Sequence, residues 1–191
     1  MGSLQSLPLR RNDATFLFLF FTPMLNSVMA NLSIKPIQLD LHQDICVSFR
    51  EDSFVVSFGD AKKFYEEDGK GAERYIDWLK AKISRDASSA VHVWRGDNII
   101  GQIEMGKLRN DPSRGYVFLY YLILSERGRG LGKVLDDHAM EYFKTQELQR
   151  AQLSVSPQNI PAISFYVKRG WRSLGERKDY PEVLTMEKSI V

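Results

Sequence analysis

The glycine-rich segment 127–132, Arg-Gly-Arg-Gly-Leu-Gly, constrains the fold of this chain more than any other stretch. Residues 116–124, just before it, are rich in aromatic and branched apolar side chains and predict a strand. After it, apolar residues recur at helical spacing and predict a helix. These residues are Leu131, Val134, Leu135, Ala139, Tyr142 and Phe143. The predicted order is therefore strand, glycine-rich turn, helix.

Such a turn suits a phosphate group. The first turn of a helix carries unpaired amide groups and the positive end of the helix dipole, and both favour an anion. Three residues of the turn lack a Cβ, so the backbone can bend sharply and approach a ligand closely; they are Gly128, Gly130 and Gly132. Full positive charges at the same point come from Arg127, Arg129 and Lys133. We interpret the segment as a pyrophosphate-binding turn; the alternative is a helix start that only requires glycines.

Two common nucleotide-binding patterns do not fit this segment. No Gly-Lys-Ser/Thr ends the turn, which excludes the Walker pattern. The dinucleotide fingerprint requires a different glycine spacing and an acidic residue near position 152, where the chain has glutamine.

A second segment, 159–171, reads Asn-x-x-Ala-x-x-Phe-Tyr-x-x-x-Gly-Trp and follows a short predicted strand at 153–155. It predicts a short helix, because Pro161 is tolerated in a first turn and Gly170 is a good C-terminal cap.

The two segments resemble the signatures of the GNAT N-acetyltransferases, in the order that the family has them. Residues 119–135 resemble its Arg-x-x-Gly-x-Gly loop, and 159–171 its second signature, which usually ends Tyr-x-x-x-Gly-Phe. The resemblance extends over about 34–188. One departure is Leu-Ser-Glu at 124–126, where the family often has Pro-Glu and an aromatic residue. The resemblance implies an α+β fold, with a mixed sheet splayed between its fourth and fifth strands and helices on both faces.

The resemblance also implies acetyl-CoA as co-substrate and assigns residues to it. The pyrophosphate would lie on the loop formed by Arg127, Gly128, Arg129, Gly130, Leu131, Gly132 and Lys133. The splayed strand would pair its backbone with the pantetheine arm at Leu122, Ile123 and Leu124. Asn159 would contact the cofactor from the start of the last helix, although it can also simply cap that helix.

The implied reaction is direct attack of a primary amine on the acetyl thioester, without an acyl-enzyme. An aliphatic ammonium has a pKa near 10.4, so a general base assists its deprotonation. We choose Glu104, on the third strand facing the expected acceptor side; its alternative reading is an exposed strand carboxylate. Tyr166 occupies the family position of the acid that protonates the departing thiolate, or is a core aromatic only.

The acceptor and two other functions remain open at this point. The acceptor is a small amine, an amino acid, an antibiotic or a protein amine. The main alternative is a regulatory module that binds acetyl-CoA without turnover. A toxin-like enzyme acetylating charged tRNA would need a basic face, and a net charge of +2 does not predict a nucleic-acid partner. A homodimer is compatible with the family.

Composition predicts neither a disulfide nor a metal. Cys46 is the single cysteine, and its helical apolar surroundings favour a buried core thiol. The three histidines, His42, His92 and His138, show no metal-ligand spacing.

Residues 1–30 differ from the rest and are expected to be an apolar N-terminal extension preceding one domain at 31–191. The apolar run 16–21 after Arg10 and Arg11 superficially resembles a signal peptide, but it is too short to cross a membrane. We expect a cytoplasmic protein. Within the domain, the pattern predicts strands at 33–39, 91–94, 99–105, 116–124, 153–155 and 183–188, helices at 41–58 and 72–83 besides the two above, and a polar loop at 107–115.

Overall fold

The computed structural model describes residues 31–190, so the expected extension at 1–30 lies outside the described residues. The described part forms one seven-stranded sheet in the order β1-β2-β3-β4-β5-β7-β6. The elements in chain order are β1 (Leu32–Pro36), α2 (Leu39–Phe58), α3 (Lys62–Tyr65), α4 (Gly71–Arg85), η1 (Ala87–Ser89), β2 (Ala90–Arg95), β3 (Asn98–Leu108), β4 (Asp111–Leu122), η2 (Leu124–Glu126), α5 (Gly132–Thr145), β5 (Arg150–Val155), α6 (Ile160–Lys168), β6 (Arg172–Arg177) and β7 (Tyr180–Ser189).

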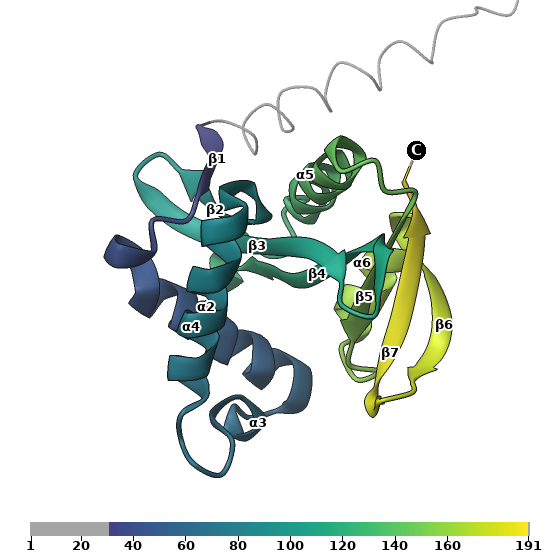
Figure 1. The fold of residues 1–191 in the computed structure, drawn as a ribbon, viewed down its shortest axis with the longest axis horizontal. Coiled ribbons are helices and arrows are strands. Elements are labelled where there is room, and N and C mark those ends of the chain that lie inside the picture. Colours follow the sequence, from purple (N-terminus) through teal and green to yellow (C-terminus); the bar gives the residue numbers. More distant parts are fainter. Residues whose placement is uncertain (1–30, 191) are drawn as a thin grey trace, which may run out of the picture. The chain divides into compact units, whose positions relative to one another are not determined.

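The sheet is mixed, and it opens between β4 and β5. All neighbouring strands are antiparallel except this pair, which is parallel and matches only three residues on each side, ending at Val117 opposite Leu153. Beyond Val117 the two strands diverge, and Figure 1 shows β1 to β4 on one side of this point and β5, β7 and β6 on the other. The predicted fold, with its splay between the fourth and fifth strands, is confirmed.

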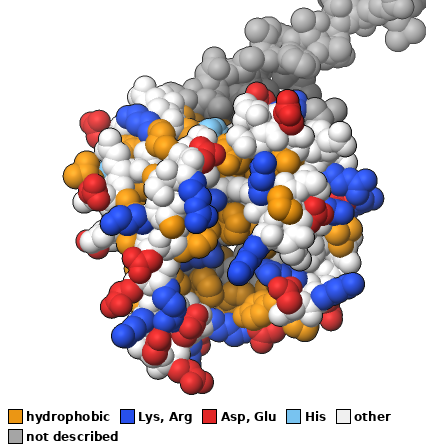
Figure 2. Space-filling model, in the orientation of Figure 1, with side chains coloured by type: hydrophobic (Ala, Val, Ile, Leu, Met, Phe, Trp, Pro, Cys, Tyr) orange, Lys and Arg blue, Asp and Glu red, His pale blue; other side chains and the backbone are white. Residues whose placement is uncertain are grey.

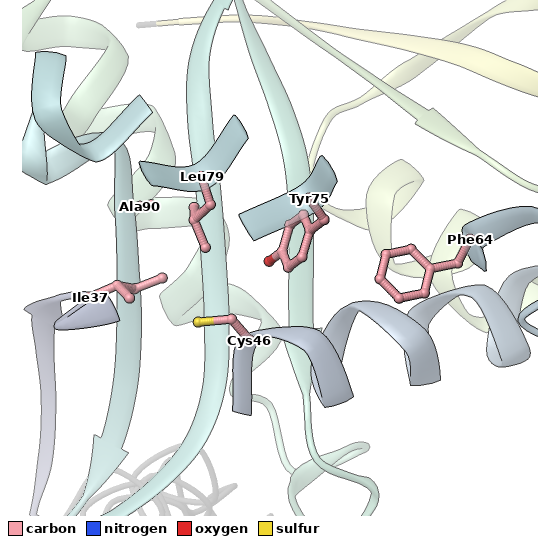
Figure 3. Close-up of a cluster of buried hydrophobic side chains, with 6 residues drawn as sticks. All are labelled: Ile37, Cys46, Phe64, Tyr75, Leu79 and Ala90. Carbon is pink, nitrogen blue, oxygen red and sulfur yellow. The ribbon is translucent and has the colours of Figure 1, made fainter. Parts of the chain in front are cut away.

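Helices cover both faces of the sheet. On one face Glu104 of β3 contacts Tyr75 of α4, and on the other Tyr120 of β4 contacts Tyr166 of α6. Figure 3 shows side chains from α2 and α4 meeting in a core cluster that includes Cys46. Cys46 is fully buried, so the predicted core thiol is confirmed.

Asp136 of α5 connects this helix to the end of α6 and to β7. Its carboxylate is fully buried and accepts hydrogen bonds from Arg169 Nε at 2.9 Å, Trp171 Nε1 at 2.9 Å and Lys188 Nζ at 2.7 Å. Arg169 caps α6 and Lys188 belongs to β7. One carboxylate therefore holds α5, the end of α6 and β7 together.

Two predictions from the sequence were wrong. Residues 107–115 are not a loop, because β3 continues to Leu108 and β4 begins at Asp111, which leaves only 109 and 110 as the hairpin turn. Strand β6 was missed, because this edge strand is mostly exposed and lacks the alternation of apolar residues that marks a half-buried strand. None of the helices at 31–190 is long and apolar enough to cross a membrane.

Candidate active site

The edge of β4 that faces β5 is open beyond Val117. The Ile123 amide donates to the Ile100 carbonyl of β3, and hydrogen-bonding directions alternate along a strand. The backbone groups of Phe118, Tyr120 and Leu122 therefore point to the opposite, open edge. Two side chains confirm this direction: Arg50 Nη1 donates to the Phe118 carbonyl at 2.9 Å and Arg127 Nε to the Leu122 carbonyl at 2.8 Å.

This open edge overlaps only partly with the predicted pantetheine segment. Leu122 ends the strand, the Ile123 amide is used by β3, and Leu124 is 78% exposed at the start of η2. The open backbone positions begin earlier, at Phe118, where the pairing with β5 has ended.

The open edge leads into the glycine turn. Gly128 and Gly130 have φ values of 73° and 83°, a region that residues with a Cβ rarely adopt, and a Cβ on either would meet open space. The amides of Lys133 and Val134 already donate to the carbonyls of Gly130 and Leu131. The amides just before them precede the first helical hydrogen bonds of α5, and such groups bind anions.

Gly132, the first residue of α5, is required for a different reason. A Cβ at this position would lie 2.8 Å from the Phe165 ring of α6. The close approach places the start of α5 against α6, so the two sequence signatures meet in space.

The cationic side chains of the turn differ in direction. The Arg127 guanidinium turns back, pairing with Asp52 of α2 at 2.6 Å in addition to the Leu122 carbonyl. Lys133 pairs with Asp137 one helical turn later. Arg129 is exposed, and within residues 31–190 it makes no ion pair. Arg129 is therefore the side chain of the turn that is free to meet a phosphate.

Asn159 caps α6. Its Oδ1 accepts from the Ala162 amide at 3.3 Å, which leaves the side-chain NH₂ group available. The capping role is observed, and a contact with the cofactor stays a prediction.

Tyr166 lies beside the open edge on the α6 side of the sheet. Its ring centroid is 6.3 Å from that of Tyr120 and 6.0 Å from that of Trp171. Its hydroxyl makes no hydrogen bond within the described part of the chain. Burial, with a smaller contribution from the Asp136 carboxylate, raises the pKa of Tyr166 far above its usual value. The phenol therefore keeps its proton at neutral pH and can donate a hydrogen bond.

Glu104 lies on the opposite face of the sheet and is fully buried, not an exposed strand carboxylate. Its Oε1 accepts from Tyr75 Oη at 2.5 Å and from Gln102 Nε2 at 2.8 Å. Its Oε2 has no hydrogen-bond partner among the described residues, and lies 3.7 Å from Arg50 Nη1. The first oxygen is thus held in place, and the second is buried beside Arg50 without a hydrogen bond.

A buried polar chain fixes this carboxylate. Gln102 Oε1 is 3.0 Å from His92 Nε2, so this nitrogen must donate and carry the proton. Burial lowers the pKa of His92 to about 4, which keeps the ring neutral at neutral pH. Burial, and next the Glu104 charge, raises the pKa of Tyr75, which stays a donor to Glu104.

Sequence reasoning missed the residues that surround Glu104. Arg50, Tyr75 and Phe118 line a cavity of about 330 Å³ between the N-terminal helices and β4. Tyr75 had a place in the apolar pattern of its helix, and Arg50 carried no signal at all. Among the described residues, no group of three or more His, Cys, Asp or Glu side chains could hold a metal ion.

The comparisons with known proteins agree with this geometry. The model of the Acetyltransferase (GNAT) family matches residues 47–171, more than half of the chain. The chain therefore belongs to the GNAT acetyltransferase family. No curated protein matches the chain.

Solved structures share the fold at low identity. PaiA N-acetyltransferase from Thermoplasma acidophilum, in complex with coenzyme A, is 20% identical with a TM-score of 0.66, covering 83% of this chain and 98% of its own. Spermidine N-acetyltransferase from Vibrio cholerae, in complex with CoA and spermine, is 15% identical with a TM-score of 0.63, covering 84% and 96%. Ribosomal-protein-alanine N-acetyltransferase from Brucella melitensis is 15% identical with a TM-score of 0.63, covering 82% and 99%.

Proposed function

We propose that the protein transfers the acetyl group of acetyl-CoA to a primary amine by direct attack. The observation that carries the proposal is the continuous path from the open edge of β4 into the glycine turn. The backbone of 118–122 would pair with the pantetheine arm, and the amides of 128–132 would bind the pyrophosphate, with Arg129 adding a charge. These residues fit the extended, anionic shape of the cofactor.

The two proposed catalytic residues, Glu104 of β3 and Tyr166 of α6, lie on opposite faces of the sheet. A thioester beside Phe118 and Tyr120 would have Glu104 on the face of α2 and α4, and Tyr166 on the face of α6. Glu104 Oε2 takes a proton from the acceptor's ammonium, directly or through water, and the resulting neutral amine is the nucleophile. The Tyr166 hydroxyl donates to the sulfur as its negative charge develops. Glu104 would thus act on the entering amine and Tyr166 on the departing thiolate.

Amine-dependent release of the CoA thiol tests this function. The protein is incubated with acetyl-CoA alone and with each member of a set of primary amines, and thiol release and N-acetyl product are followed. We expect release that depends on an amine and matches product formation. Binding of acetyl-CoA without acetylation of any amine would favour the regulatory module instead.

A further inference from the structure

The cavity lined by Arg50 and Tyr75, two residues that contact Glu104, has the size and lining of a small-molecule acceptor site. Its volume of about 330 Å³ falls in the range of ligand pockets. Half of its ten lining residues are aromatic: Phe54, Phe64, Tyr75, Trp78 and Phe118. Phe118 is also the first residue of β4 beyond its pairing with β5, so the cavity reaches the point where the sheet opens. In Figure 2, hydrophobic side chains are visible in a hollow of this face, with Lys and Arg side chains around it.

Two of the three cations that line the cavity pair with exposed carboxylates. Lys63 pairs with Glu182 of β7, and Arg74 pairs with Glu66 and Asp68. These outer ion pairs leave little net charge to attract a ligand.

Arg50 differs from the other two cations, because the carboxylate nearest to it is the buried Glu104. Its Nη1 donates to the Phe118 carbonyl and is 3.7 Å from Glu104 Oε2, longer than a hydrogen bond. Its Nε and Nη2 donate to no acceptor at 31–190. Its guanidinium carbon is 5.6 Å and 5.7 Å from the ring centroids of Phe54 and Tyr75, and its side chain keeps 23% of its surface accessible. Arg50 therefore presents unused donors of a planar fork to the cavity.

This position of Arg50 affects which amines can reach Glu104. A simple ammonium would meet the guanidinium charge beside the carboxylate and be repelled. An acceptor with its own carboxylate would instead offer the fork a bidentate partner. In an α-amino acid one carbon separates the carboxylate from the amine, so binding to Arg50 would hold the amine close to this guanidinium, whose Nη1 lies 3.7 Å from Glu104 Oε2. The aromatic walls would hold an apolar side chain.

We propose that the acceptor is a free amino acid with an apolar or aromatic side chain, bound through its carboxylate by Arg50. This inference rests on the proposed function and names its acceptor class.

Matched pairs of acceptors test the inference on the unmodified protein. Phenylalanine is compared with phenylethylamine, and leucine with isopentylamine, with rates expressed per unprotonated amine, because the carboxylate also changes the amine pKa. We expect kcat/KM to be about tenfold or more higher for the amino acid in at least one pair, the size of one charge-assisted hydrogen bond. Equal rates, or a preference for the decarboxylated amines, would overturn the inference and leave the proposed function intact. Acetyl-CoA binding without acetylation of any amine would contradict both.

Variants of Arg50 identify the residue responsible. Arg50→Gln should reduce the preference to about one, because kcat/KM should fall more for the amino acid than for the amine. Arg50→Lys keeps the charge without the planar fork and should give an intermediate preference. Arg85→Gln, the same change on an exposed position of α4, should keep the full preference. A preference that persists in Arg50→Gln would assign carboxylate recognition elsewhere and overturn the inference.

Discussion

Replacing Tyr166 with phenylalanine is expected to lower kcat by about 10²- to 10⁴-fold, the usual contribution of one acid-base group. The change removes only the hydroxyl, which makes no hydrogen bond within 31–190, so ring packing against Tyr120 and Trp171 is retained. Because burial raises the pKa of Tyr166, the hydroxyl keeps its proton through the neutral range. The thiolate would then leave without a donor.

The measurement is steady-state thiol release, with acetyl-CoA affinity determined by calorimetry on the same samples. Affinity should stay nearly unchanged, because the loss belongs to the transition state. Tyr142→Phe is the matched control, since the hydroxyl of this α5 tyrosine donates to Asp86 and belongs to neither the open edge nor the glycine turn, so its loss should not lower kcat. A Tyr166→Phe protein with the original kcat would show that Tyr166 is a core aromatic only.

Asp136→Ala should lower the free energy of unfolding by about 3–5 kcal/mol, the range for breaking a buried ion pair. The substitution leaves Arg169 and Lys188 without their buried carboxylate, and the Trp171 indole N–H without its acceptor. These partners lie at the C-terminal end of α6, in the link to β6 and on β7, so one side chain joins three separate parts of the C-terminal half to α5.

Urea denaturation measures this effect, and the next residue along the chain provides the control. Asp137 pairs with Lys133 and Arg169 but is exposed, so Asp137→Ala should lower the free energy of unfolding by at most about 1 kcal/mol. Equal effects of the two substitutions would show that Asp136 does not hold these elements together.

The parts of the site that sequence predicted are those encoded locally. The glycine turn and the buried positions of α5, such as Leu135 and Phe143, follow from residues adjacent in the chain. The cap at Asn159 is equally local. Strand β6 was missed because it forms at the edge of the sheet by pairing with β7, and its exposed residues show no apolar pattern.

The surroundings of Glu104 could not be predicted, because they come from distant segments. Tyr75 lies 29 positions away and contacts Glu104 only because α4 packs over β3. The direction of Arg127 has the same cause, since its partner Asp52 lies on α2, 75 positions earlier. Periodicity reports which face of an element is buried, but not which polar groups meet there.

Calorimetric titration with acetyl-CoA is the most direct test of the proposed cofactor site. It uses the unmodified protein, Gly130→Glu and Gly175→Glu. Gly175 is the matched control, because it also has a positive φ of 92° and open space at its Cβ, but lies on β6. We expect the unmodified protein and Gly175→Glu to bind, and Gly130→Glu to bind about 100-fold more weakly, or ~2.7 kcal/mol, because its carboxylate would repel a pyrophosphate at the proposed site. Equal affinity of all three proteins, or no binding by the unmodified protein, would contradict the proposed cofactor site.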